Sequence, residues 1–236
     1  MPTELPATHA SGDRPRVLVT AGPTEEPIDE VRFIGNRSSG RMGIEIARAF
    51  ADAGCGVTLL LGPIRGDAPV HSRITCVRFR TAAELAGALG REAAAHPVLI
   101  MAAAVADFRP ATASPGKILR GGSLELRLEA VPDLIGSLPR HPGSFRLGFA
   151  LEEPARLLER ARVKLSSKDL DAVVANPLAT MESGSVDATL VWRDGRLERA
   201  ADGAIDKRDF ARWLAGRILA VVPATATPKE STCDSR

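Results

Sequence analysis

The sequence predicts an α/β fold in which a mostly parallel sheet is covered by helices on both faces. Short apolar runs rich in β-branched residues alternate with amphipathic helical patterns along most of the chain. The apolar runs are nearly continuous, which is typical of parallel strands buried on both faces. We therefore expect a Rossmann-like, doubly wound sheet in three α/β/α layers, with an added β-hairpin extension.

The first half of the chain shows this alternation most clearly. We expect strands at 16–20, 56–62, 74–79 and 98–103, with helices at 43–53 and 82–95. Gly54 fits the position just after the first helix, where left-handed residues are common. Thr81 fits the N-cap of the second helix, because its hydroxyl can accept a hydrogen bond from a first-turn N–H.

The second half repeats the unit and then departs from it. We expect a strand at 145–150, a helix at 153–168 and a strand at 171–176. Strict alternation over 124–130, after Gly121–Gly122, predicts a hairpin over 117–128. Asp194–Gly195 predicts the turn of a second hairpin over 188–200.

A last amphipathic helix is expected from Asp206 to about residue 222. Its core-facing stripe comprises Phe210, Trp213, Leu214, Ile218 and Val221. The segments 1–14 and 223–236 are rich in Pro, Thr, Ser and charged residues, so we expect disordered tails there. Between them, 15–222 is expected to form a single domain.

Composition argues against several classes of protein. The net charge of +2 and the lack of a long Lys/Arg run give no electrostatic footprint for nucleic acid. The longest apolar stretch, 97–106, is about half the length that a membrane helix needs, and 1–14 lacks the apolar core of a secretory signal. Cys55, Cys76 and Cys233 are widely spaced. We therefore expect a reduced, cytoplasmic protein that binds neither nucleic acid nor membrane.

Small residues follow the predicted strands at their carboxyl ends. They occur at 21–24, 62–63, 103–107, 148–150 and 175–176. Ligands of open parallel sheets bind outside the carboxyl ends of the strands, near the point where the strand order reverses. Small side chains there let a ligand approach the backbone, so the sequence predicts a binding crevice at this edge.

The stretch GNRSSGRMG at 35–43 lies directly before the first predicted helix. Ser38 or Ser39 is a candidate N-cap, and Arg37 and Arg41 would add positive charge to the helix N-terminus. A phosphate site is one interpretation of this pattern. An ordinary capped helix start is the other, and the stretch alone leaves both open.

Other chemistries lack the residues that they need. About fifteen residues separate the first strand from the glycines, and the second strand has no acidic residue at its tip, which disfavours NAD(P) binding. The P-loop pattern, metal-ligand histidine spacing and a nucleophile next to a base are all missing from the sequence. The polar residues that remain suit nucleotidyl transfer, in which the protein positions the substrates and its charged side chains neutralise the phosphates. They are Asn36, Ser38, Asp107, Lys117, Lys164 and Lys168.

Several segments resemble the phosphopantothenate–cysteine ligase family in order and spacing over roughly 15–220. They are RVLVTAGPTEEPIDEVRFIGNRSSGRMGIEIARAF, MAAAVADFRP, VPDLI, GFALE and KDLDAVVAN. The resemblance implies a ligase that joins 4′-phosphopantothenate to L-cysteine in coenzyme A biosynthesis. It implies an acyl-nucleotide intermediate, release of pyrophosphate and CMP, CTP rather than ATP as the favoured co-substrate, Mg²⁺ on the triphosphate, and a homodimer.

The resemblance also implies roles for individual residues. Asn36 corresponds to the asparagine that contacts the acyl intermediate, and Lys117 to a mobile lysine that neutralises the phosphates. The expected nucleotide-binding residues are Met101, Ala102, Ala103, Asp107, Lys117, Pro132, Asp133, Leu134, Ile135, Phe149, Lys164 and Lys168. The expected substrate-binding residues are Arg32, Asn36, Ser38, Ala103, Ala104 and Asp107. Arg32 reaches the substrate phosphate across the dimer interface in some members, and we expect no metal-binding set of side chains.

The sequence departs from the family pattern in places. Arg41 stands where lysine is usual, Pro177 replaces an aspartate, and MESGSVD at 181–187 replaces a GF-x-SD-x-N element. These changes motivate an alternative, a non-catalytic nucleotide- or phosphate-binding homologue that partners a separate flavin-dependent decarboxylase. In bacteria the family resembled here often forms the C-terminal half of a bifunctional protein whose other half is a flavin-dependent decarboxylase. No such half occurs in this sequence, so we do not expect decarboxylation from it.

Overall fold

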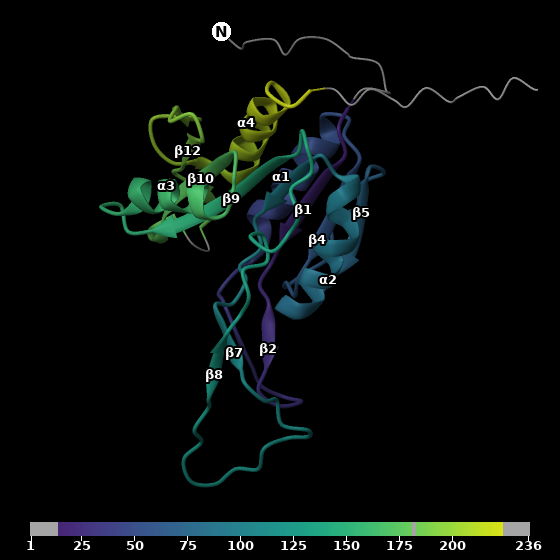
Figure 1. Cartoon of the computed structure of the whole chain (residues 1–236), viewed down its shortest axis with the longest axis vertical. Coiled ribbons are helices and arrows are strands. Elements are labelled where there is room, and N and C mark those ends of the chain that lie inside the picture. Colours follow the sequence, from purple (N-terminus) through teal and green to yellow (C-terminus); the bar gives the residue numbers. More distant parts are fainter. Residues whose placement is uncertain (1–13, 181–182, 224–236) are drawn as a thin grey trace, which may run out of the picture.

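A computed structural model describes residues 14–180 and 183–223 (Figure 1). An eight-stranded sheet lies at its centre, in the order β13-β12-β10-β9-β6-β1-β4-β5. Its strands are β1 (Val17–Ala21), β4 (Val57–Leu61), β5 (Ile74–Arg78), β6 (Val98–Met101), β9 (Phe145–Glu152), β10 (Ala172–Pro177), β12 (Thr189–Trp192) and β13 (Leu197–Arg199). The first six of these along the chain run parallel, in the 3-2-1-4-5-6 order of a doubly wound sheet. This confirms the predicted fold class.

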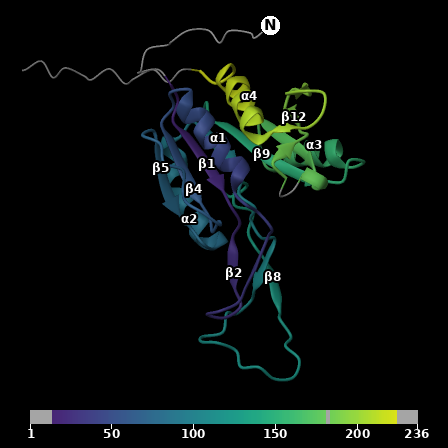
Figure 2. The same cartoon turned by 180° about the vertical axis from the view of Figure 1, so that it is seen from behind.

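Helices cover both faces of the sheet, as the apolar strands predict (Figure 2). The helices are α1 (Arg41–Asp52), α2 (Ala82–Glu92), α3 (Leu157–Ser167) and α4 (Lys207–Leu219), with short 3₁₀ turns at Ala93–Ala95 and Leu178–Thr180. Val17 and Val19 of β1 pack in one core cluster with α1 and α4. Leu18, pointing the other way, packs in a second cluster with α2 and α3. No helix of the described chain is both long and apolar enough to cross a membrane.

Local hydrogen bonds explain where α1 ends and where α2 begins. Gly54, with φ of 91°, follows α1, and the N–H groups of Gly54 and Cys55 donate to the carbonyls of Ala51 and Phe50. Thr81 caps α2 by accepting a hydrogen bond from the Glu84 N–H at 3.2 Å. Both predictions are confirmed. The stripe predicted for α4 is right except at Val221, which is 45% exposed, whereas Val222 is buried.

An extension projects from the carboxyl edge of the sheet, and we call residues 25–35 and 108–130 the arm (Figure 1). It contains two short antiparallel pairs, β2 (Glu25–Pro27) with β3 (Phe33–Gly35) and β7 (Phe108–Pro110) with β8 (Leu128–Ala130). Asp29 links them, because its carboxylate accepts hydrogen bonds from the N–H groups of Arg32 (2.7 Å) and Ile118 (3.1 Å). A third small pair joins β11 (Ser185–Val186) to β14 (Ile205–Asp206) next to α4.

The hairpin predicted over 117–128 is wrong. The residues that pair are 108–110 and 128–130, and 111–127 forms a loop without strands. The alternating run finds no second apolar layer to bury its leucines, since Leu124 and Leu126 are 54% and 40% exposed. The second hairpin is confirmed, because β12 and β13 pair around Asp194–Gly195 and Gly195 has φ of 90°.

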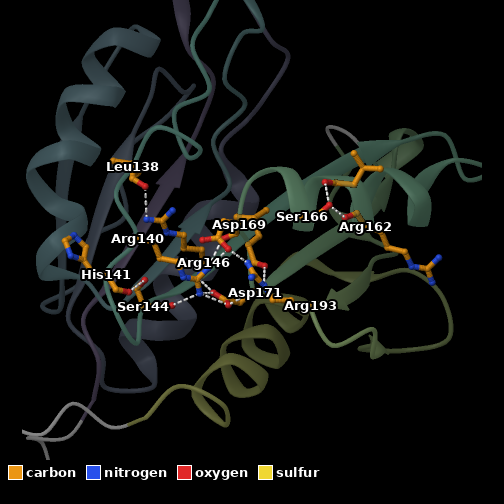
Figure 3. Close-up of polar contacts among 12 residues, drawn as sticks. Leu138, Arg140, His141, Ser144, Arg146, Arg162, Ser166, Asp169, Asp171 and Arg193 are labelled. Carbon is orange, nitrogen blue, oxygen red and sulfur yellow. Dashed lines mark hydrogen bonds and ion pairs between the residues drawn. The ribbon is translucent and has the colours of Figure 1, made fainter.

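A network of ion pairs ties the amino end of β10 to its neighbours (Figure 3). The Asp171 carboxylate accepts hydrogen bonds from the Arg140 guanidinium at 2.7 and 2.8 Å and from the Arg146 N–H at 2.8 Å. Arg140 and Arg193 both also contact Asp169. The network therefore joins the segment before β9, the α3–β10 turn and the β12–β13 turn, at the end of the sheet opposite the arm.

Replacing Asp171→Asn should lower the free energy of unfolding by about 1–3 kcal/mol, since partly buried charged hydrogen bonds are lost. Urea denaturation measures this change. The matched control is Asp187→Asn, whose carboxylate pairs with Arg199 at the surface and should matter by less than about 0.5 kcal/mol. Equal effects of the two substitutions would contradict the structural importance of the network.

Candidate functional site

A pocket of about 710 Å³ lies where the start of α1 meets the carboxyl ends of β6, β9 and β10. This volume is typical of a cavity that holds a small molecule. Three continuous segments line it, 36–43, 101–107 and 131–135, together with side chains from α3 and α4. The position agrees with the predicted crevice at 103–107, 148–149 and 176, whereas the small residues at 21–24 and 62–63 do not line the pocket.

The loop before α1 begins the helix through backbone geometry. Gly40 is the N-cap with φ of 69° and has no side chain to cap the helix, although Ser39 Oγ accepts a long hydrogen bond from the Arg41 N–H at 3.4 Å. The prediction of Ser38 or Ser39 as the N-cap is therefore wrong, although Ser38 Oγ accepts a hydrogen bond from the Gly40 N–H (3.3 Å). A Cβ on Gly40 would lie 2.8 Å from the Ile64 side chain. The residue at this position must therefore lack a side chain and also adopt a left-handed backbone conformation.

Gly43 brings the first turn of α1 directly against β1. A Cβ at this position would lie 2.5 Å from the Ala21 Cβ and 2.9 Å from the Thr20 carbonyl oxygen. The first turn of α1 carries no acidic side chain, and residues 40–43 line the pocket. The partial positive charge of the helix N-terminus is therefore available to an anion in the pocket.

Hydrogen bonds fix the segment 101–107 to the neighbouring chain. The Ala103 and Ala106 N–H groups donate to the hydroxyls of Thr20 and Thr24, both at 3.0 Å. Asn36 Nδ2 donates to the Val105 carbonyl at 2.8 Å. The Asn36 amide is thus held at the mouth of the pocket with a second N–H left to donate.

Positively charged side chains outnumber negative ones around the pocket. The cations are Arg37, Arg41, Lys164, Lys168 and Lys207, and the carboxylates are Asp107 and Asp133. Lys168 pairs with Asp133 at 3.1 Å, and Lys164 donates to the Phe149 carbonyl. Burial, followed by the nearby charge of Lys168, lowers the pKa of Lys164. An anion of several charges would compensate this excess.

The pocket brings together most of the residues that the sequence singled out. They are Asn36, Ser38, Met101, Ala102, Ala103, Ala104, Asp107, Pro132, Asp133, Leu134, Ile135, Phe149, Lys164 and Lys168. Arg32 and Lys117 do not line it and lie on the arm instead. Arg32 is held there by Asp29 at 2.7 Å and by the Ile118 carbonyl, and Lys117 is exposed in the loop 111–127.

Sequence reasoning missed other residues of the pocket. They include Leu170, Thr180, Val186 and Lys207, whereas Gly148 and Asn176 belong to the strand-end residues that predict the crevice. Lys207 follows the N-cap of α4 and carries no local sign of a binding role. Only the packing of α4 beside α1 brings this lysine to the pocket.

Reactive side chains elsewhere are used in packing. Burial raises the pKa of the Cys55 thiol to about 11, so it stays protonated at neutral pH. His96 is buried, with its ring nitrogens at 2.9 Å from Thr58 Oγ1 and 2.6 Å from the Glu92 carbonyl. Within 14–180 and 183–223, no group of three or more His, Cys, Asp or Glu side chains could hold a metal ion.

Comparison with known proteins shows similarity to one family and to proteins of coenzyme A biosynthesis. Residues 13–221 match the family described as the DNA/pantothenate metabolism flavoprotein C-terminal domain. The chain is 37% identical over 190 residues to the coenzyme A biosynthesis bifunctional protein CoaBC of Vibrio cholerae, covering 77% of this chain and 47% of that protein. It is 43% identical over 172 residues to a cysteine/cysteine sulfinic acid decarboxylase from an unknown prokaryotic organism, covering 72% of this chain and 47% of that protein. The chain thus spans about half the length of these relatives.

The fold agrees with a crystal structure of the C-terminal domain of the bifunctional protein CoaBC. The TM-score is 0.74 at 30% sequence identity, covering 89% of this chain and 96% of that domain. The likeness therefore extends over nearly the whole of that domain.

Gly43→Ala should lower the free energy of unfolding by about 1–3 kcal/mol, because the added methyl group meets the backbone of β1. Gly90→Ala is the matched control, since Gly90 lies exposed in α2 and a methyl group there would meet nothing within 4 Å. This control should stabilise the protein by about 0.4–1 kcal/mol. Thermal or urea unfolding measures both, and a neutral Gly43→Ala would contradict the close approach of α1 to β1.

Proposed function

The chain belongs to the DNA/pantothenate metabolism flavoprotein C-terminal domain family, and from this premise we propose that it is a ligase that joins 4′-phosphopantothenate to L-cysteine. The reaction would serve coenzyme A biosynthesis, the pathway named for the bifunctional relatives. The observation that carries the proposal is the pocket. It places the amide of Asn36, the start of α1 and an excess of cationic side chains around one cavity.

The proposed reaction proceeds in two steps. A carboxylate oxygen of 4′-phosphopantothenate bonds to the α-phosphorus of CTP, the bond to the bridging oxygen breaks, and pyrophosphate leaves. The amine of cysteine then bonds to the acyl carbon, loses a proton, and displaces CMP. ATP is the other nucleotide candidate, and CTP is favoured by the family resemblance. Mg²⁺ would neutralise part of the triphosphate charge.

Different groups around the pocket would bind different parts of the substrates. The N-terminus of α1 and the lysines of α3 would attract the phosphates, while Asp107 and the backbone of 101–103 would hold the nucleoside. The free N–H of Asn36 would donate to the oxygen on which charge develops as the acyl group reacts. Lys117, on a loop that contains Gly116 with φ of 80°, would close over the phosphates.

A homodimer is part of the proposal. The arm exposes large apolar side chains, namely Val31, Phe33, Phe108, Leu119, Leu124, Leu126 and Leu128. An exposed apolar surface of this kind is typical of a protein interface. Arg32 and Lys117 lie on this same arm, outside the pocket of their own chain. A second copy of the chain would both cover the arm and receive these cations at its pocket.

The alternative is a nucleotide-binding homologue that partners a separate decarboxylase. The relative named as a cysteine/cysteine sulfinic acid decarboxylase motivates it, together with the departures from the family pattern after β10. Pro177 nevertheless continues β10, and Thr180 Oγ1 both donates to the Pro177 carbonyl (2.7 Å) and accepts from Asn176 (3.1 Å). This part of the loop is therefore ordered beside the pocket, which favours the ligase. Residues 181–182 lie outside the described residues.

Pyrophosphate release tests the proposed function. The assay contains 4′-phosphopantothenate and Mg²⁺, with CTP or ATP, and with or without cysteine. Cysteine-dependent turnover with CTP is the expected result. No release with either nucleotide, from protein that binds CTP, would support the non-catalytic alternative instead.

Asn36→Ala should slow turnover by about 100-fold, the usual cost of removing one donor to a developing oxyanion. CTP binding, followed by calorimetry, should change little because the cations of the pocket remain. A melting curve checks that loss of the Val105 hydrogen bond does not unfold the loop. Turnover equal to that of the unaltered protein would exclude Asn36 from the mechanism.

Mixing two inactive variants tests whether the arm completes the pocket of a second copy. Arg32→Ala and Asn36→Ala homodimers should each be nearly inactive. After exchange of subunits, mixed dimers have one intact pocket, so about a quarter of the normal activity should return. An active Arg32→Ala homodimer would exclude Arg32 from the site. No recovery, in a mixture whose mixed dimers are detected through a tag on one variant, would mean that Arg32 serves the pocket of its own chain.

A further inference from the structure

A second helix begins at the same end of the pocket as α1. The starts of α1 and α4 are joined by the Arg41–Asp206 ion pair at 3.7 Å and, one turn further along, by the Glu45–Arg208 pair at 3.5 Å. The two helices pack against one core cluster, and residues 40–43 of α1 and Lys207 of α4 all line the pocket. Two helix N-termini therefore meet at this end of the cavity.

Lys207 is the first residue of α4 and is only 7% exposed, although it carries a charge. Its ammonium group makes no hydrogen bond or ion pair with any other residue that the structure describes. The adjacent carboxylate of Asp206 is engaged elsewhere, since it accepts from the Arg208 N–H at 2.7 Å and pairs with Arg41. The buried side-chain atoms of the described chain that lack a hydrogen-bond partner do not include Lys207 Nζ, so this ammonium group is open to the pocket that Lys207 lines, where a bound anion would replace water as its partner.

The other lysines of the pocket differ in this respect. Lys168 pairs with Asp133, and Lys164 donates to a carbonyl oxygen. Their charges are thus partly compensated on the α3 side, where the two carboxylates of the pocket also lie near Lys164. The positive charge without a partner among the described residues lies on the opposite side, at Lys207, next to Arg41, which shares its charge with Asp206. Burial, and then the charge of Arg41, lowers the pKa of Lys207, and a bound anion would oppose both effects.

We propose that Lys207, together with Arg41 and the start of α1, binds the two terminal phosphates of the nucleotide and holds them as pyrophosphate leaves. This inference rests on the proposed ligase function. When the substrate carboxylate bonds to the α-phosphorus, the bond from that phosphorus to the bridging oxygen breaks and its electron pair stays on the departing pyrophosphate. Lys207 stabilises this added negative charge as a fixed cation and transfers no proton.

The affinities for inorganic pyrophosphate and for CMP, compared in the same variant, distinguish loss of a contact to the terminal phosphates from a general disturbance of the pocket. Calorimetry on Lys207→Gln should show pyrophosphate binding weakened about 10- to 100-fold, the usual range for a lost hydrogen bond to a charged group. CMP has no terminal phosphates, so its affinity should change by less than about 2-fold. The matched control is Arg212→Gln, which removes one charge from an exposed position on the same helix and should leave both affinities unchanged.

Different results overturn the inference and the proposed function. Pyrophosphate affinity unchanged in Lys207→Gln, or an equal loss of CMP affinity, overturns the role of Lys207 even if the protein is an active ligase. Pyrophosphate binding that depends on Lys207, in a protein that never ligates, supports the phosphate site and overturns the ligase. If Lys207→Gln does not fold, the unaltered protein is acetylated with acetic anhydride and followed by mass spectrometry. Protection of Lys207 by pyrophosphate but not by CMP supports the inference, and equal labelling overturns it.

Discussion

The close packing of α1 against the carboxyl ends of β1 and β4 is the constraint on which the site depends. Glycines make it possible, because side chains at Gly43 and Gly40 would meet the Thr20 carbonyl oxygen at 2.9 Å and the Ile64 side chain at 2.8 Å. This contact fixes the first turn of α1 relative to the sheet. The loop before it has to cross the strand ends, where its backbone and Asn36 face the pocket.

The second side of the pocket is attached to the same strand. The hydroxyls of Thr20 and Thr24 accept hydrogen bonds from the backbone of 101–107, just where the chain leaves β6. The segments that follow β1 and β6 stay side by side, because the Ala104 N–H donates to the Gly22 carbonyl at 2.9 Å and Pro23 pairs with Ala104. The pocket lies beside this paired segment, towards the start of α1 and the strands β9 and β10. The polar backbone groups around the pocket are held in place before any ligand arrives, which reduces the cost of ordering them on binding.

Charge is distributed unevenly between the pocket and the arm. The pocket contains buried or half-buried lysines on α3 and α4, whereas Arg32 and Lys117 lie on an extension with exposed apolar side chains. Asp29 orders the arm internally, but the arm has no core of its own. These two features together are the reason for assigning the arm to contact with a second copy, and they explain why one chain does not bring all the expected residues to one place.

Local interactions are the part of this protein that the sequence by itself determined. The strands follow from continuous apolar runs, and Gly54, Thr81 and Asp194–Gly195 mark ends and turns through hydrogen bonds within a few residues. Only the tertiary structure decided where distant segments meet. Gly40 replaces a serine cap because α1 is pressed against the strand ends, and the run at 124–130 stays unpaired along most of its length because no layer covers it. Lys207 reaches the pocket only because α4 packs beside α1, a contact between residues far apart in the chain that no local pattern encodes.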